Sequence, residues 1–221
     1  MTATHPLARP LAALLLIPFG LWVQAAPLND TGQTNCYDIN TNAVANCSTA
    51  TGSQDGRYGR DAAHQVSPLL PPKVGAGAAG FDFTALDVSG TATAPGTHEC
   101  VKDNVTGLIW STETLGAMTW DAANTAAISY HRCGYTSGWR LPTVRELLSI
   151  VHRGIASGAA IDGTYFPDTQ AGYADMYWTA NAYAPASARA WQVGFTYGGT
   201  HASDKTDPYH RSYVRLVRSE Q

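Results

Sequence analysis

The chain has 221 residues and a formal net charge of −3, and only 14% of its residues are charged. This length suits one domain with an appendage, and a slightly acidic chain without a basic cluster argues against nucleic acid and anionic lipid as partners. Glycine is abundant and charged residues are few, which is typical of loop-rich extracellular β structure.

The N-terminal residues have the pattern of a secretory signal peptide. Arg9 supplies a charged n-region, residues 11–23 form an interrupted apolar run, and residues 23–27 (VQAAP) offer a small-residue cleavage site. The apolar run is short for a membrane span, which disfavours the alternative of a retained N-terminal anchor. We predict that residues 1–25 are removed and that the mature chain is exported to the periplasm, the cell surface or the medium, without inserting into a membrane.

Four cysteines, an even number in an exported chain, predict disulfide bonds. Three pairings are possible, and we favour pairing in sequence order, Cys36 with Cys47 and Cys100 with Cys133. On the loop-entropy model these bonds contribute about 3 and about 4 kcal/mol to stability. A zinc site is the alternative, but the spacings contain no C-x₂-C element.

Residues 26–99 are predicted to form a small hairpin followed by a connector. The polar, turn-rich segment 36–47 indicates a hairpin closed by its disulfide, and residues 71–80, rich in proline, glycine and alanine, indicate the connector. Weak alternation over residues 81–88 predicts a short edge strand.

The compact domain is predicted to span residues 100–221. Residues 100–110 have the pattern of a strand, a tight turn over residues 104–107 and a second strand. Thr119 is a suitable cap for a helix that runs to about His131.

A second helix is predicted over residues 143–153. Thr143 and Glu146 have the spacing of a capping box, in which each side chain bonds the backbone amide of the other. The apolar residues that follow recur at helical spacing and form one stripe for a core. Arg140, just before the cap, offers a planar fork of donors that could tie loop carbonyls together.

The last fifty residues are predicted to be strands. They cover residues 176–180, 188–195, 200–203 and 212–218, and residues 197–200 form a hairpin turn. Two helices followed by antiparallel strands predict an α+β fold with the helices on one side. Four tryptophans lie in periodic apolar patterns, so we expect them all in the core: Trp110, Trp139, Trp178 and Trp191.

Five separated segments resemble, in the expected order, the Lcl C-terminal domain family, a domain of unknown function in exported bacterial proteins. They are residues 103–110, 133–143, 177–180, 190–195 and 213–218. The resemblance implies a C-type-lectin-like fold, related to that of formylglycine-generating enzymes. The namesake domain belongs to a surface adhesin that binds sulfated polysaccharide, but a shared fold implies no shared reaction.

The residues disfavour several specific chemistries. The calcium-binding triplets of true C-type lectins are absent, and Asp204 with Asp207 supplies too few oxygens for calcium. Formylglycine-generating chemistry uses cysteines late in the domain, and none follows Cys133. The sequence contains no G-x-S-x-G, H-E-x-x-H or P-loop motif. His201 and His210 flank one hairpin, but a pair of histidines alone is too few for zinc.

We therefore expect a non-enzymatic binding module with no cofactor or metal, whose partner is a glycan or an envelope or surface protein. Aromatic faces beside hydrogen-bonding groups suit such contacts. The alternatives are an accessory subunit of a surface or secretion assembly, docked through residues 26–99, and a divergent enzyme. The candidate ligand-binding residues lie in loops or the late hairpin: Tyr183, Tyr197, His201, Asp204, Lys205, Asp207, Tyr209 and His210.

Overall fold

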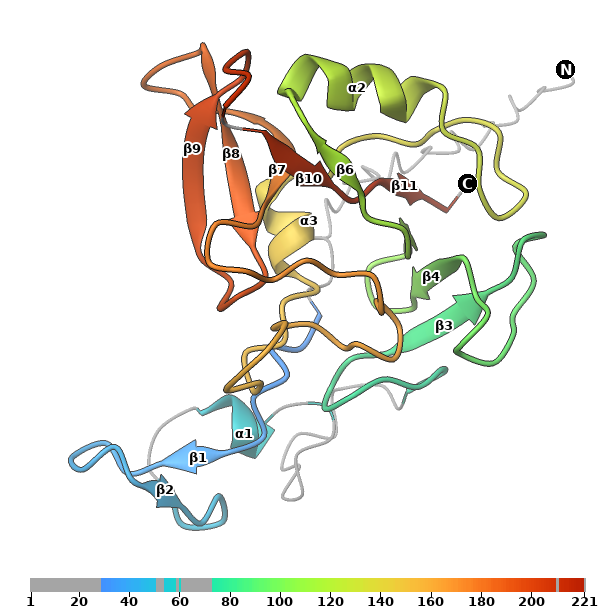
Figure 1. Cartoon of the computed structure of the whole chain (residues 1–221). Helices are drawn as coiled ribbons and strands as arrows, with labels where there is room; N and C mark the ends of the chain where they lie inside the picture. The colour runs from blue at the N-terminus through green and yellow to red at the C-terminus, as the bar shows by residue number, and fades with distance from the viewer. Residues whose placement is uncertain (1–28, 51–53, 59, 61–72, 210, 221) are drawn as a thin grey trace, which may run out of the picture.

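The computed structural model describes residues 29–50, 54–58, 60, 73–209 and 211–220. Within these ranges the chain forms a two-stranded ribbon, two larger sheets and short helices, which confirms the predicted α+β class (Figure 1). The predicted signal peptide lies outside the described residues. None of the helices in the described ranges is long and apolar enough to cross a membrane.

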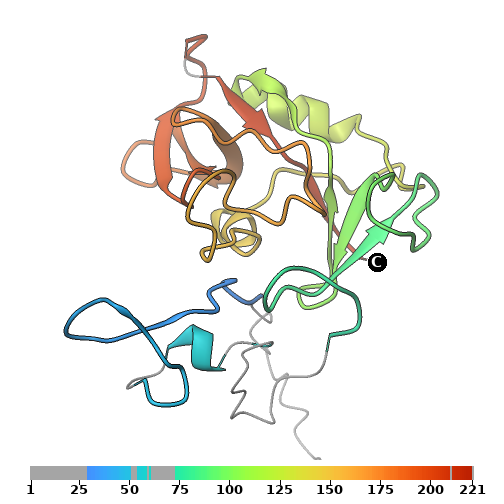
Figure 2. The same ribbon diagram turned by 60° about the horizontal axis from the view of Figure 1, so that its bottom comes forward.

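The N-terminal part is the predicted disulfide-closed hairpin. Strands β1 (Cys36–Tyr37) and β2 (Val44–Ala45) pair antiparallel, and the bond between Cys36 and Cys47 closes them. The short helix α1 (Asp55–Tyr58) lies beside β1. Figures 1 and 2 show this ribbon set apart from the two larger sheets.

The chain segment just before the ribbon contacts the main domain. The carbonyl of Thr31 accepts a hydrogen bond from the amide of Arg153 at 2.8 Å. Gly32 has φ +77° and packs so closely that a Cβ there would lie 2.6 Å from Nδ1 of His152. Glycine is therefore the residue that permits this approach.

One of the two larger sheets has four antiparallel strands in the order β11-β5-β4-β3. Their bounds are β3 Phe83–Leu86, β4 Cys100–Asp103, β5 Leu108–Ser111 and β11 Val217–Ser219. The strand predicted over residues 81–88 is β3, and it lies at the edge of the sheet as expected. In the predicted turn between β4 and β5, the buried carboxylate of Asp103 accepts from the amides of Val105 and Thr106.

The other sheet has five strands in the order β6-β10-β7-β8-β9. Their bounds are β6 Leu115–Met118, β7 Met176–Ala182, β8 Arg189–Gly194, β9 Thr200–Asp204 and β10 Ser212–Val214. All neighbours are antiparallel except β10 and β7, where Tyr213 pairs with Tyr177 in parallel. The turn predicted between β8 and β9 is present, with Gly198 at φ +75°.

The prediction of one strand over residues 212–218 is wrong. The segment forms two strands, β10 and β11, which belong to different sheets. Between them lies Arg215, which is fully buried. Its Nη1 donates to the carbonyls of Ser111 and Thr112 at 3.0 Å. A side chain with five donors satisfies carbonyls that the bend leaves without sheet partners.

Both predicted helices are present and shorter than predicted. Helix α2 (Trp120–Ile128) begins at the Thr119 cap. Helix α3 (Val144–Leu148) has the predicted capping box but covers only five residues, because the chain turns at Ser149. Arg140 bonds one loop carbonyl, that of Leu141, and otherwise the carboxylate of Glu146.

The core lies on both faces of the five-stranded sheet. Neighbouring residues of β7 belong to different clusters: Tyr177 packs in the cluster with Leu147 of α3, and Trp178 in the cluster with Ala123 of α2. The helices therefore cover opposite faces, and not one side as predicted. Trp110, Trp139 and Trp178 are buried as predicted, whereas Trp191 is only half-buried, so the prediction for that residue is wrong.

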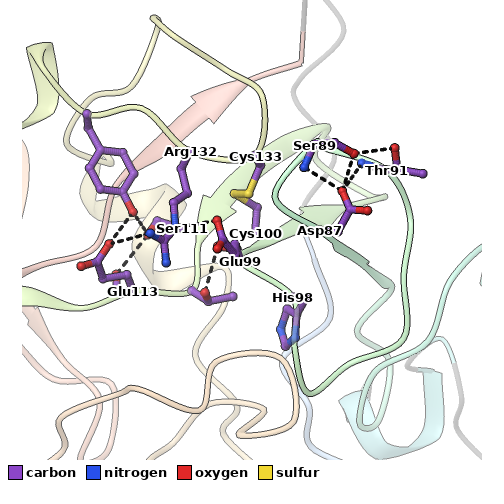
Figure 3. Close-up of a disulfide and its surroundings, with 12 residues drawn as sticks. Asp87, Ser89, Thr91, His98, Glu99, Cys100, Ser111, Glu113, Arg132 and Cys133 are labelled. Carbon is purple, nitrogen blue, oxygen red and sulfur yellow. Dashed lines mark hydrogen bonds and ion pairs between the residues drawn. A yellow bond between two sulfur atoms is a disulfide. The ribbon is translucent and has the colours of Figure 1, made fainter.

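The second disulfide joins Cys100 of β4 to Cys133 after α2, as predicted (Figure 3). Beside it, Arg132 bonds the carboxylate of Glu99 at 3.1 Å and reaches that of Glu113 at 3.8 Å. Tyr130 donates to Glu113, and its burial above all raises its pKa to about 12. This disulfide and the polar network beside it fix the end of α2 to the four-stranded sheet. The two disulfides of the chain are compatible with an exported protein.

Candidate functional site

A hollow of about 480 Å³ lies over the end of the five-stranded sheet where β8 turns into β9. Strands β7 to β10 supply its floor, and the loop before β7, the β8–β9 turn and the loop after β9 supply its rim. We call it the tyrosine hollow. Its lining residues are Tyr173, Ala174, Met176, Gln192, Gly194, Thr196, Tyr197, Gly199, Thr200, His201, Ser203, Tyr209, Arg211 and Ser212.

Three tyrosines on the rim are unusually exposed. Tyr173 is 89% exposed, Tyr197 66% and Tyr209 92%, and they come from three separate loops. A tyrosine ring in water exposes a large apolar face, which is normally covered in a soluble protein. In the described part of the chain, these are the only tyrosines among the strongly exposed large apolar side chains, and all three surround one hollow.

The floor of the tyrosine hollow is polar. The buried amide of Gln192 donates from Nε2 to Oγ of Ser212 at 2.7 Å. On the neighbouring strand β9, Ser203 is also buried, whereas His201 is exposed. Arg211 lies at the side, where its Nε donates to the carbonyl of Pro208. Hydroxyl, amide and guanidinium groups thus lie below and beside aromatic faces.

The structure brings three of the predicted site residues together at this hollow: Tyr197, His201 and Tyr209. Arg211 and Tyr173 also line it, and the sequence analysis missed both. Tyr173 lies in a long loop, and in the sequence it is only an aromatic residue among residues that favour turns. It is distant in sequence from the β8–β9 turn, and only the folded chain brings the two together.

Three other predicted site residues, Asp204, Lys205 and Asp207, make contacts that hold the loop after β9 in place. Oδ1 of Asp204 accepts from the amide of Thr206, which above all holds the pKa of Asp204 below its usual value. Asp207 accepts from the amide of Tyr209. Nζ of Lys205 lies 4.4 Å from the ring centre of Trp120 and so holds the loop against α2.

Two predicted residues remain. His210 lies outside the described residues, so its place beside the hairpin that His201 flanks stays a prediction. Tyr183 lies on the other side of the sheet from the hollow's floor and meets Trp191 edge to face, with ring centres 5.1 Å apart. Among the described residues, no three histidine, cysteine, aspartate or glutamate side chains lie close enough together to hold a metal ion.

A second, larger concavity of about 870 Å³ lies on the opposite face, between residues 29–31, α3 and the ends of β7 and β8. We call it the arginine groove. Its lining residues are Asn29, Asp30, Thr31, Thr143, Val144, Arg145, Leu148, Ser149, Val151, Arg153, Asn181, Ala182, Ala184, Trp191 and Thr200. Thr200 lines both concavities, so the β8–β9 hairpin separates them.

The fold and the disulfides define a small disulfide-bonded α+β domain with two mainly antiparallel sheets and an N-terminal ribbon. The chain belongs to the Lcl C-terminal domain family, whose model matches residues 99–218. The match includes all five segments on which the resemblance was based, and both larger sheets apart from β3 and the last residue of β11. The search of curated proteins found no match to the chain.

Proposed function

We propose that this protein is an exported, non-enzymatic binding module that recognises a glycan through the tyrosine hollow. The observation that carries the proposal is the gathering of Tyr173, Tyr197 and Tyr209 around one polar floor. Sugar rings present flat C–H faces, which stack on aromatic rings, and hydroxyl groups, which bond to polar side chains.

The polar groups of the floor suit hydroxyl ligands. Gln192 and Ser212 are held in place by their mutual hydrogen bond, and each keeps further donor or acceptor capacity. Arg211 and His201 are the basic side chains of the lining, and no carboxylate is among the residues that line it. A glycan with acidic groups therefore meets no repulsion there. The C-type-lectin-like fold that the resemblance implies is also consistent with glycan recognition.

Glycan-array binding by the full chain tests the proposal. We expect a defined set of glycans to bind, and Tyr173→Ala, Tyr197→Ala and Tyr209→Ala each to weaken the affinity about two- to twelvefold, since an aromatic contact contributes about 0.5–1.5 kcal/mol. Tyr183→Ala is the matched control, because this tyrosine lies outside the hollow, and it should leave glycan affinity unchanged.

Binding to no glycan would reject the proposal, as would glycan binding that all three hollow variants retain. The three tyrosines are exposed, so their replacement should leave the free energy of unfolding within about 0.5 kcal/mol of that of the unsubstituted chain. A loss of binding then reports on the hollow and not on folding.

A second candidate function is docking as an accessory subunit of a surface or secretion assembly. One observation favours it: the β1–β2 ribbon stands apart from the sheets and exposes Ile39 and Val44, each by 69%. The paired replacement Ile39→Ser and Val44→Ser should then abolish crosslinking of the full chain to its envelope partner in the native host. Unchanged crosslinks would argue against docking through the ribbon.

A further inference from the structure

Two arginines of the arginine groove differ from every other arginine in the described ranges. The guanidinium groups of the other eight each bond to a backbone carbonyl or carboxylate or lie over an aromatic ring. Those of Arg145 and Arg153 make no hydrogen bond, ion pair or ring contact to a described residue, and both are exposed. The two unpartnered arginines line the same groove.

The two arginines come from different segments. Arg145 is on α3, whereas Arg153 follows it and donates its amide to the carbonyl of Thr31. The one carboxylate of the lining, Asp30, already accepts from the amides of Gly32 and Arg60. The groove therefore presents two separate positive charges in a chain whose net charge is −3.

The arginine groove also has an apolar part. Val144 and Leu148 of α3 face it, together with Trp191 of β8. Trp191 is half-buried, and its indole N–H has no hydrogen-bond partner within the described ranges. Val193 and Phe195, further along the same face, pack in the core cluster with Leu147 of α3, whereas Trp191 belongs to neither core cluster.

We propose that the arginine groove binds a short peptide segment of a partner protein, with acidic side chains on both sides of an apolar anchor residue. The apolar floor around Trp191 takes the anchor, and Arg145 and Arg153 pair with the carboxylates. Tryptophan and arginine are the residues that most often carry the binding energy of protein interfaces. Two charges on separate segments fit carboxylates spaced along a peptide, and such a peptide can pair with both at once.

The test uses the full chain and three fluorescein-labelled heptapeptides, measured by fluorescence anisotropy at physiological salt. The first alternates glutamate and leucine, the second alternates lysine and leucine, and the third alternates glutamate and serine. We expect only the first to bind. The double variant Arg145→Gln and Arg153→Gln should weaken that binding roughly tenfold, and Trp191→Ala should weaken it at least as much.

Arg211→Gln is the matched control, because Arg211 is an exposed arginine of the tyrosine hollow on the opposite face. It should bind the glutamate–leucine peptide as the unsubstituted chain does. Equal binding of the lysine–leucine peptide, unchanged binding by the double arginine variant, or no binding at roughly millimolar peptide would each overturn the proposal. Saturable binding of sodium decanoate or a sulfated disaccharide in the groove, without peptide binding, would also overturn it and assign the groove to a small anion.

Discussion

The carboxylate of Glu146 receives two parallel hydrogen bonds from the guanidinium of Arg140, at 2.6 and 2.8 Å. The same carboxylate accepts from the amide of Thr143 at 2.7 Å and so closes the capping box of α3. The backbone of Arg140 in turn exchanges both hydrogen bonds with Val217 of β11. One carboxylate thus connects the start of a helix to the edge of the four-stranded sheet.

Replacing Glu146 should separate its two roles. Glu146→Gln retains an oxygen for the amide of Thr143 but loses the charge that pairs with Arg140, and we expect a loss of about 1 kcal/mol in the free energy of unfolding. Glu146→Ala loses both roles and should cost about 2 kcal/mol. Urea unfolding monitored by tryptophan fluorescence measures both. Equal stability of the two variants would show that only one of the roles contributes.

Acid should weaken the same connection. Burial raises the pKa of Glu146, but hydrogen bonds from Arg140 and Thr143 outweigh burial and leave the pKa below its usual value. A carboxyl whose pKa is lowered in the folded state stabilises fully above its unfolded pKa of about 4.3 and loses that contribution as pH falls through the folded pKa. The midpoint temperature of thermal unfolding should therefore fall less steeply between pH 6 and pH 2 in Glu146→Gln than in the unsubstituted chain. Parallel curves would contradict this assignment.

The buried guanidinium of Arg215 is expected to be essential for stability. Besides the two carbonyls, its Nη2 donates to the hydroxyls of Thr114 and Thr169 at 2.9 and 2.8 Å. Arg215→Met leaves buried acceptors without donors, so we expect a loss of about 3 kcal/mol or more. Arg211→Met, at an exposed position, is the control, and its free energy of unfolding should stay within about 0.5 kcal/mol of that of the unsubstituted chain. Comparable unfolding midpoints for the two variants would disprove the role assigned to Arg215.

The two disulfides should differ in what they stabilise. Replacing Cys100 and Cys133 together by alanine opens a loop of 33 residues within the main domain and should cost about 4 kcal/mol in global stability. Replacing Cys36 and Cys47 together affects the ribbon, which stands apart. We therefore expect faster proteolysis between residues 36 and 47, with little change in the unfolding midpoint of the sheets. A large fall in that midpoint would show that the ribbon and the sheets unfold as one unit.

Local chemistry predicted much of the fold. The cap of α3, the cap of α2 at Thr119 and the turn before β5 depend on residues close in sequence, and each is present. Strand β6 was missed because its residues, Leu115–Met118, show no alternation and are largely exposed; pairing with β10 makes it a strand. The break at Arg215 was missed for a related reason: alternation identifies extended chain but not the sheet to which each part belongs.

The candidate site was predicted only in part, because the sequence does not show which surface residues the rest of the fold covers or which distant segments meet. Period-two alternation placed Trp191 on the same face as Val193, which is correct, but the sequence does not indicate which part of that face the core covers. Tyr197 and Tyr209 were expected at a surface because they lie in turns. That Tyr173 joins them, and that residues 29–31 form one wall of the arginine groove, depends on contacts between distant parts of the chain.

The division of residues 212–219 between two sheets affects when the domain can fold. Tyr213 must find Tyr177, and Arg218 must find Ile109, so the segment that completes both sheets is synthesised after every strand it joins. Long-range pairings of this kind slow folding, because the chain must close large loops before it gains their contacts. During synthesis the domain therefore remains unable to reach its native state until the residues up to Ser219 have left the ribosome.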